Sequence, residues 1–437
     1  MKKYLLIGLL LLTAVRAEAK LMDLGYFELD NGLKVAVVEN HKAPIALAMV
    51  YYKVGSVNDP NGQGGIAHLL EHMMFRGTKN LPKQMFNELA DENGAANNAY
   101  TTYGETAYHE LADISKLELM LAMEAERMQN LTMDENDFLK ERGVVLQERM
   151  QRFETNPVPL FYEMMSKSLW QNHPLAKPVS GSVADINGLT VKNARDFYDK
   201  YYCPDNALLV LAGDITINEA RILAQKYFGA ISPKKEKYEL NWDKVRDTDT
   251  EMVVKLEGIN QPRYVQYIRI DEKSLTKKDV VALDLLTAYF TEDDSDYLID
   301  KLVYQDKSML GVSMGISYDD TLGGTLALYA IPSSDKMTLS EIKKILWNGI
   351  TDGYMQFSEA NLEKIKHRIL ANTVYMQESM QSSARFVSNL LMNGYSAEEI
   401  RTMDDTIRNI TLQDIQTAWQ KVMTSKGQVS GYLTGRN

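Results

Sequence analysis

The sequence of 437 residues repeats part of itself at an offset of 221 residues. An apolar segment, the helix expected after it and the strand expected after that helix all recur, the last with a one-residue slip. The matched pairs are 186–191 with 407–412, 197–200 with 418–421, and 208–213 with 429–435. A repeat at half the chain length implies two duplicated domains. The chain is therefore expected to have an α+β fold made of two homologous α/β-sandwich halves.

The length of the chain agrees with this division, because it exceeds what one hydrophobic core usually supports. A charged stretch between the repeats is expected to be the linker, 233–245. The first half would then span 20–232 and the second half 246–437. Apolar residues make up 45% of the chain and charged residues 24%, which is typical of globular proteins and does not indicate disorder.

Residues 1–19 have the pattern of a secretory signal peptide. Two lysines come before an apolar run at 4–15, and a cleavage site with small residues ends at Ala19. The run is too short for a stable membrane anchor, and no cysteine follows it to accept a lipid. We expect cleavage after Ala19 and a periplasmic or secreted protein without stable membrane insertion. A retained signal anchor is the alternative.

Charge and cysteine content disfavour two other classes of protein. The net charge of −11 disfavours a nucleic-acid-binding role. The single cysteine, Cys203, excludes an intramolecular disulfide. Because it precedes Pro204, we expect it to be a structural residue near a turn rather than a nucleophile.

Local patterns predict the first elements of the chain. Residues 25–53 alternate between apolar and polar and contain many β-branched residues, which predicts two strands with tight connections. A glycine-rich loop follows and ends where a helix begins near residue 66. This loop lacks G-x-G-x-x-G and a Walker lysine, so phosphate binding is not expected. Residues 115–131 predict an amphipathic helix.

Residues 68–72 read His-Leu-Leu-Glu-His, a spacing that fits a metal site. On a helix, His68 and His72 project from one face, so their imidazoles can hold one zinc ion. Glu71 on the same turn could take a proton from a metal-bound water. The order is the inverse of the commoner zinc-protease motif His-Glu-x-x-His. Two imidazoles and a carboxylate in this apolar segment would be unfavourable without a partner.

A third ligand is expected on the helix that follows a capping box at 132–135 and runs to about residue 153. Its inward stripe places two carboxylates where the helical period calls for apolar residues. The stripe consists of Phe138, Glu141, Val145 and Glu148. A solvated charged face is the usual explanation of such glutamates. A catalytic zinc takes three protein ligands, and spacing leaves open which glutamate is the third and which orients a histidine.

The stretch 65–78 strongly resembles the pitrilysin/insulinase family of zinc peptidases, the inverzincins, and looks closest to the branch of the processing peptidases. The pattern at 141–148 matches that family as well. The resemblance implies a clamshell-like metallopeptidase with one Zn²⁺ per chain. The residues it implies are His68, His72 and Glu148 as metal ligands, with Glu71 and Glu141 as catalytic residues.

A further match to the family lies at 98–102, which resembles its active-site strand. The edge of that strand pairs with the substrate backbone, so the resemblance implies that Asn98 and Ala99 bind the peptide. Without the resemblance, a polar loop would be the ordinary interpretation. The implied function is zinc-dependent hydrolysis of internal peptide bonds in extended or unfolded polypeptides.

One part of the family pattern is missing from the second half, which also lacks a His-x-x-Glu-His motif. Complete members carry an arginine and, seven residues later, a tyrosine that grip the substrate and stabilise the oxyanion. Val303 and Leu310 stand approximately in their place. No spacing supports Tyr304, Lys307 or Tyr318 as replacements. We therefore expect a zinc-bearing subunit whose homologous, non-zinc partner supplies the pair in a heterodimer; a homodimer stays open.

Two alternatives come from other classes of function. One is a non-catalytic structural or assembly subunit with the same fold, which the missing pair favours and the intact ligand set disfavours. The other is a purely structural zinc site. Such sites are usually closed by four ligands and rich in cysteine, whereas this chain has one Cys.

Overall fold

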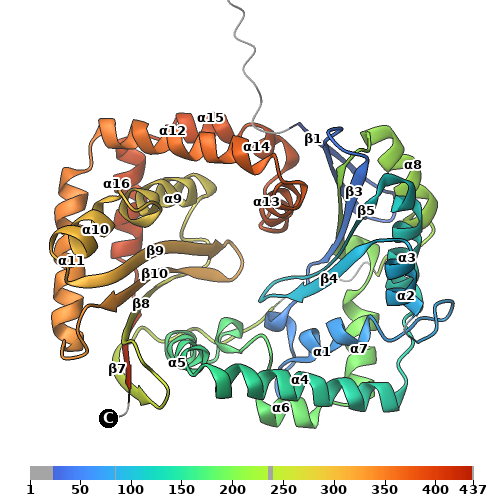
Figure 1. Ribbon diagram of the computed structural model, residues 1–437, viewed down its shortest axis with the longest axis horizontal. Coiled ribbons are helices and arrows are strands. Elements are labelled where there is room, and N and C mark those ends of the chain that lie inside the picture. The colour runs from blue at the N-terminus through green and yellow to red at the C-terminus, as the bar shows by residue number, and fades with distance from the viewer. Residues whose placement is uncertain (1–22, 84, 235–239, 436–437) are drawn as a thin grey trace, which may run out of the picture.

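The computed structural model describes residues 23–83, 85–234 and 240–435. The predicted signal peptide, 1–19, and part of the predicted linker, 233–245, lie outside these residues. The described chain forms two halves, each built on its own sheet, which lie on opposite sides of a ring-shaped outline (Figure 1). The expected α+β fold of two homologous halves is confirmed.

The first sheet has six strands in the order β1-β2-β6-β3-β5-β4. They are β1 (Leu24–Glu28), β2 (Lys34–Glu39), β3 (Ile45–Tyr52), β4 (Ala96–Thr101), β5 (Thr106–Asp113) and β6 (Ala207–Gly213). Two strands were predicted in 25–53, but the structure has three there, so the prediction was wrong. The chain turns at Gly32, where a φ of 86° favours glycine, and again at 40–44, so three strands fit. β4 pairs only with β5 and forms an edge of the sheet.

The second sheet has five strands in the order β7-β11-β8-β10-β9. They are β7 (Asp249–Leu256), β8 (Arg263–Ile270), β9 (Met309–Asp319), β10 (Gly323–Pro332) and β11 (Gln428–Gly435). In both sheets the last strand of the half runs parallel to one neighbour, since β6 pairs in parallel with β2 and β11 with β7. The sheet topology therefore repeats as the sequence does.

Helices of each half cover one face of its own sheet (Figure 1). In the first half these are α1 (Ile66–Met73), α2 (Met85–Glu92), α3 (Leu117–Asn130), α4 (Glu135–Thr155), α6 (Val183–Gly188), α7 (Val191–Tyr201) and α8 (Ile217–Phe228). In the second half they are α9 (Lys277–Thr291), α10 (Tyr297–Ile299), α11 (Leu339–Gln356), α12 (Glu359–Met376), α15 (Met403–Arg408) and α16 (Leu412–Met423). The short helix α14 (Ala397–Arg401) instead packs against the first half, where Arg401 donates to the carbonyl of Leu24. The helix predicted at 115–131 is α3, and its Met120, Leu121 and Met128 are buried as expected.

The N-cap of α4 differs from the prediction. Asp134 is the N-cap, and its carboxylate accepts hydrogen bonds from the backbone N–H groups of Asn136 and Asp137. Thr132, which the sequence suggested as the cap, instead donates its hydroxyl to the carbonyl of Gly77 at 2.9 Å. That contact ties the loop before α4 to the segment after α1.

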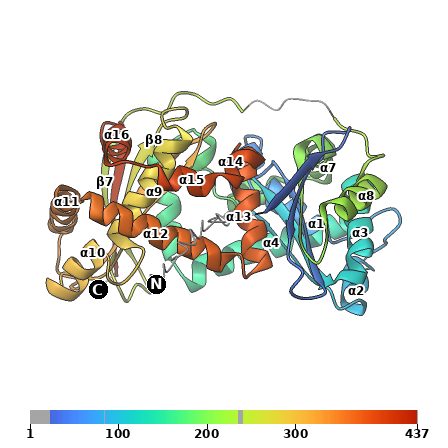
Figure 2. The ribbon, with the colours of Figure 1, turned by 90° about the horizontal axis from the view of Figure 1, so that it is seen from above.

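One long helix of each half crosses to the sheet of the other half. These helices are α5 (Val158–Trp170), which packs on β11 and β8, and α13 (Met380–Met392), which packs on β2, β3 and β6. Figure 2 shows α12 reaching from the second half toward the first, with α13 against the first half's strands. Because α5 follows α4 as α13 follows α12, the two crossing helices are equivalent members of the repeat. The halves are thus interlocked by a reciprocal exchange.

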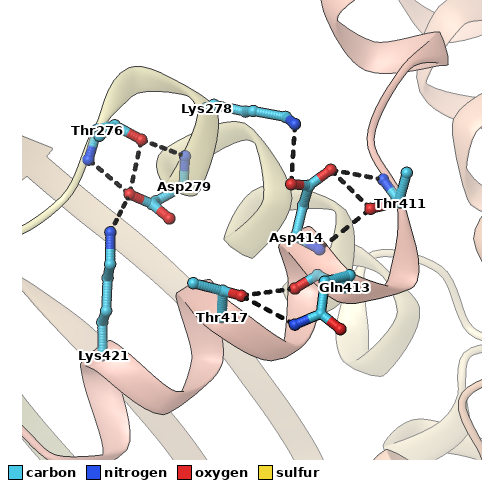
Figure 3. A network of polar contacts seen from close by, with 8 residues as sticks. All are labelled: Thr276, Lys278, Asp279, Thr411, Gln413, Asp414, Thr417 and Lys421. Atoms are coloured by element: carbon cyan, nitrogen blue, oxygen red, sulfur yellow. Dashed lines mark hydrogen bonds and ion pairs between the residues drawn. The ribbon is translucent and has the colours of Figure 1, made fainter.

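Polar contacts tie the N-terminal turn of α9 to both ends of α16 (Figure 3). Asp279 of α9 accepts a hydrogen bond from Lys421 Nζ at 2.7 Å. Asp414 of α16 accepts one from Lys278 Nζ at 2.8 Å. Each carboxylate also accepts from the hydroxyl of its own N-cap threonine, so it is part of a capping box. The two crossed ion pairs fix how α16 sits on α9.

A cavity of about 1400 Å³ lies between the halves. The first half lines it with residues 101–105, which follow from β4, and with the inner side of α5. The second half lines it with 317–325, from the end of β9 to the start of β10. Among the described residues, no helix is long and apolar enough to cross a membrane.

Candidate metal centre and peptide site

Asp59 and a glycine fix the start of α1. The Asp59 carboxylate accepts hydrogen bonds from the backbone N–H groups of Gly65, at 2.6 Å, and Ala67, at 3.2 Å. These are N–H groups that the first turn of a helix leaves free. Gly65 has a φ of 87°, and an added Cβ would lie 2.7 Å from the carbonyl oxygen of Ser180. Only glycine fits there without strain, so the first turn of α1 is tightly placed.

His68 and His72 leave α1 on one face, with ring centroids 5.0 Å apart. Glu148 Oε2 of α4 lies 3.8 Å from His68 Nε2 and 3.6 Å from His72 Nε2. One ligand atom from each of these three residues lies within 4.8 Å of the others. Two ligands of a tetrahedral zinc, each at about 2.1 Å, are about 3.4 Å apart. The three atoms therefore have nearly the separation that a zinc ion requires.

Glu141 lies on the far side of His72 from Glu148. It is buried, and its Oε2 lies 3.3 Å from His72 Nδ1, while its Oε1 accepts from Arg76 Nη2 at 2.6 Å. A hydrogen bond from Nδ1 leaves the Nε2 lone pair of His72 directed toward Glu148. The geometry thus separates the two glutamates that spacing left open: it favours Glu148 as the ligand and Glu141 as the residue that orients His72.

The two imidazoles differ in basicity. Burial, with a smaller contribution from the charge of His72, lowers the pKa of His68 to about 4. Burial also acts to lower the pKa of His72, but hydrogen bonds to Glu141 and Glu148 outweigh it and raise this pKa to about 9. The hydrogen bond from His72 lowers the pKa of Glu148. A metal must displace the His72 proton, so its binding to these residues weakens in acid.

Glu71 points from the same turn of α1 toward β4. Its carboxylate accepts a hydrogen bond from the hydroxyl of Thr101, the last residue of β4. Burial raises the pKa of Glu71, and the hydrogen bond from Thr101 opposes that shift. A carboxyl group with a raised pKa, fixed beside a metal site, has the properties of a general base that later returns the proton.

Asn98 and Ala99 lie on β4, at the open edge of the first sheet. The segment that could have been a polar loop is therefore a strand. The side-chain carbonyl of Asn98 accepts a hydrogen bond from the backbone N–H of Ala99 at 2.8 Å. Through Thr101, this edge strand is joined to Glu71. The structure brings the predicted metal, catalytic and peptide-binding residues to one place.

The second half does not bring an arginine and a tyrosine to the expected positions. Val303 lies half-buried in a π-helical turn, and Leu310 is 57% exposed on β9. Of the three possible replacements, Tyr304 is 53% exposed, and Lys307 is exposed in the irregular segment before β9, with a φ of 52°. Tyr318 on β9 is among the residues that line the cavity, and its hydroxyl accepts a hydrogen bond from the backbone N–H of Leu275.

Three functional neighbours were not predicted as such from the sequence: Asp59, Arg76 and Thr101. Arg76 follows the metal motif by four residues and lies within the stretch that resembles the family, yet its ion pair joins it to a helix 65 positions later. Asp59 stands in a loop whose proline and glycines indicated a turn but not a cap. Only the folded chain shows that Asp59 orients α1, that Arg76 orients Glu141 and that Thr101 orients Glu71.

Comparison with known families gives two matches that together span most of the chain. Residues 34–183 match "Insulinase (Peptidase family M16)", and residues 188–369 match "Peptidase M16 inactive domain". The first match contains every residue of the candidate site, from Asp59 to Glu148. The second contains the region where the family pattern places an arginine and a tyrosine and this chain has Val303 and Leu310.

Three curated relatives show different degrees of coverage. The "Zinc protease PqqE" of Helicobacter pylori is 30% identical over 370 residues, covering 83% of this chain and 79% of the relative. The "Mitochondrial-processing peptidase subunit beta" of Rattus norvegicus is 34% identical over 202 residues, 46% of this chain and 41% of the relative. The "Cytochrome b-c1 complex subunit 1, mitochondrial" of Rattus norvegicus is 30% identical over 220 residues, 50% of this chain and 45% of the relative.

Two solved structures share the fold. A protease from Helicobacter pylori has a TM-score of 0.82 at 24% identity, covering 94% of this chain and 100% of that chain. Pitrilysin has a TM-score of 0.78 at 19% identity, and the match covers 95% of this chain but only 45% of pitrilysin. The relative from Helicobacter pylori and the two family matches establish that the chain belongs to the insulinase family, peptidase family M16.

Proposed function

We propose that the chain is a zinc-dependent endopeptidase that hydrolyses peptide bonds in extended or unfolded polypeptides. The observation that carries the proposal is the convergence of His68 Nε2, His72 Nε2 and Glu148 Oε2. Two imidazoles and one carboxylate are a common ligand set for catalytic zinc, which keeps one position open. A zinc ion bound there supplies a Lewis acid and lowers the pKa of a bound water.

The neighbouring residues have distinct parts in this proposal. Glu71 removes a proton from the attacking water and returns it to the leaving amine. Thr101 holds the Glu71 carboxylate through its hydroxyl, so the base is placed before the peptide binds. Glu141, itself fixed by Arg76, keeps His72 in the tautomer whose Nε2 is free to bind the metal.

The peptide is proposed to bind as an additional strand beside β4. No strand of the described residues 23–83, 85–234 and 240–435 pairs with the outer edge of β4, and backbone pairing would hold the peptide extended. Asn98 and Ala99 stand at that edge, and an incoming backbone would replace the hydrogen bond that Asn98 makes to Ala99 N–H. Because only an extended chain can pair in this way, the proposed substrates are peptides or unfolded proteins.

A partner subunit is part of the proposal. The second half lacks the arginine and tyrosine, and pitrilysin, which shares the fold, is about twice as long as the match to this chain. We infer that a homologous chain without the zinc motif supplies the missing pair in a heterodimer. Export to the periplasm or the exterior, as residues 1–19 indicate, stays part of this proposal.

The test separates metal binding from turnover. Glu71→Gln should retain one zinc per chain yet lose activity by at least about a hundredfold, because general acid–base catalysis contributes about 10²–10⁴-fold. His68→Ala and Glu148→Ala should lose the metal itself. Metal content is measured by mass spectrometry and turnover with unstructured peptides. Glu135→Gln, an exposed glutamate on α4 outside the site, is the matched control and should change neither.

Each outcome has one interpretation. Zinc loss from Glu71→Gln would mean that the ligand set is different. Rates typical of complete family members from the chain alone would disprove the heterodimer. Full zinc content without turnover, both alone and with its partner, would establish the non-catalytic subunit instead.

A further inference from the structure

Arg152 lies on the same face of α4 as the proposed ligand. It follows Glu148 by four residues and Glu141 by eleven, which places it about 40° and about 20° from them around the helix. Its side chain is exposed and lines the cavity together with Thr101 and Tyr103, at the end of β4. Arg152 therefore stands between the proposed metal site and the space that a peptide beside β4 would enter.

Arg152 has no counter-ion in the described part of the chain. The contrast with Arg149, one turn earlier, is direct: Arg149 is largely buried, and its guanidinium binds both oxygens of Glu163 and the hydroxyl of Ser180. No hydrogen bond or ion pair joins Arg152 to any other described residue. Its charge still acts on the site, since it adds to the lowering of the Glu148 pKa that the hydrogen bond from His72 dominates.

The charges of the cavity lining make this arginine distinctive. Among the residues that the structure describes, Arg152 and Lys53 are the two cations on the lining, and Arg152 is the one on the helix that carries Glu148. Of the acidic lining residues, Glu163 is already neutralised by Arg149. A free guanidinium presents a planar fork of N–H donors that matches a carboxylate, and such charge-assisted hydrogen bonds are among the stronger ones in proteins.

We propose that Arg152 is a specificity-determining residue that binds a carboxylate of the peptide substrate near the scissile bond. The inference rests on the proposed peptidase function. It names the substrates of that function as peptides that place a carboxylate beside Arg152, either from an acidic side chain or from their own C-terminus. One helical turn advances about 5.4 Å and an extended residue about 3.3 Å, so the carboxylate lies about two residues from the scissile bond.

The test measures binding rather than turnover, so it does not depend on a partner. The zinc-loaded Glu71→Gln protein is titrated with fluorescent, otherwise neutral peptides of about ten residues in which one Glu is moved along the sequence. Gln peptides and peptides ending in an amide or a free carboxylate complete the set. We expect about tenfold tighter binding at one Glu register, or for the free carboxylate, than for the matched neutral peptide.

Variants of Arg152 then assign the preference. Arg152→Gln in the same background should abolish the difference between Glu and Gln peptides without weakening the Gln peptide. Arg152→Glu should instead favour a Lys at the same register. Lys140→Gln removes an exposed cation from α4 that does not line the cavity, and it should leave the preference unchanged.

Four results overturn the inference. Equal binding of Glu and Gln peptides at every register would show that the site has no charge preference. A Glu preference that survives Arg152→Gln would place the carboxylate elsewhere. Equal weakening of Glu and Gln peptides would give Arg152 a general role in binding the backbone or the oxyanion. Failure of every peptide to bind the zinc-loaded protein would refute the peptide site itself, and that result is distinct from binding without a charge preference.

Discussion

Replacing Gly431 with alanine tests the contact through which α5 crosses to the second sheet. Gly431 lies on β11, and an added Cβ would be 2.3 Å from Met165 Sδ and 2.7 Å from Phe161 Cζ of α5. Both of those side chains are completely buried, so neither can swing into solvent. The φ of Gly431 is not positive, so alanine adds a steric clash and no backbone strain.

The expected loss of stability follows from this geometry. An extra methyl group in a packed core costs about 1–3 kcal/mol. With about 2–4 °C for each kcal/mol in a domain of this size, the melting temperature should fall by roughly 2–12 °C. Thermal denaturation followed by circular dichroism gives the value. Gly315→Ala on β9 is the control, because nothing lies within 4 Å of its Cβ position, and it should change stability by no more than about 0.5 kcal/mol.

A second variant identifies the clashing side chain. Met165→Ala alone should cost about 2–5 kcal/mol, since it leaves a cavity under β11. In the double variant the new methyl group occupies part of that cavity, so the combined loss should be smaller than the sum by about 1 kcal/mol or more. Strict additivity, or a Gly431→Ala protein as stable as its parent, would refute the packing of α5 on β11.

Three further perturbations test other parts of the structure. Arg127→Met should lower the free energy of unfolding by about 3–5 kcal/mol, because it leaves the buried carboxylates of Glu110 and Glu124 without their cation. Thermal denaturation measures this loss, and a melting temperature equal to that of the parent protein would contradict it. Burial raises the pKa of Cys203 to about 12, so this thiol should react with a thiol reagent only after unfolding, and rapid labelling of the native protein would be the contrary result. The hydrogen bond from Lys278 lowers the pKa of Asp414, so the ion pair between them should stabilise the fold above about pH 4 and lose this effect as the pH falls below that value. Asp414→Asn should therefore lower the free energy of unfolding by up to about 1 kcal/mol at neutral pH and by almost nothing near pH 3. Denaturation at both pH values measures the difference.

The sequence predicted much of the candidate site because the site depends on helical periodicity. The spacing of His68 and His72 on α1, and of Glu141 and Glu148 on α4, determines which side chains share a face, whatever the rest of the fold does. Spacing left the choice between the two glutamates open; the family resemblance implied Glu148, and the relative position of the helices gives the physical reason for it. Glu148 lies 3.6 Å from Nε2 of His72 and Glu141 3.3 Å from its Nδ1, a difference that no linear pattern contains.

The crossing of α5 and α13 could not be predicted, although each of these segments contains an apolar side. Periodicity shows that Phe161, Met165 and Leu169 form a stripe, but it does not show which sheet covers that stripe. The error at 25–53 has a similar cause: the two turns were recognised, but alternation alone did not show that strands continue on both sides of each turn. The cap of α4 was misplaced because Thr132 and Asp134 are both good caps, and a contact with Gly77 engages Thr132.

The reciprocal exchange of α5 and α13 has a consequence for what counts as a folding unit. A fragment spanning 20–232 would present the uncovered apolar face of its sheet and an α5 with no sheet to pack on. Two such fragments, however, could cover one another, each lending its helix to its neighbour, as in a domain-swapped dimer. In this chain the two halves are joined end to end. The exchange of helices that would occur between two separate fragments therefore occurs within one molecule. The same complementarity means that the separated halves should reassemble in trans when mixed, whereas either half alone should form a swapped dimer rather than a stable monomer.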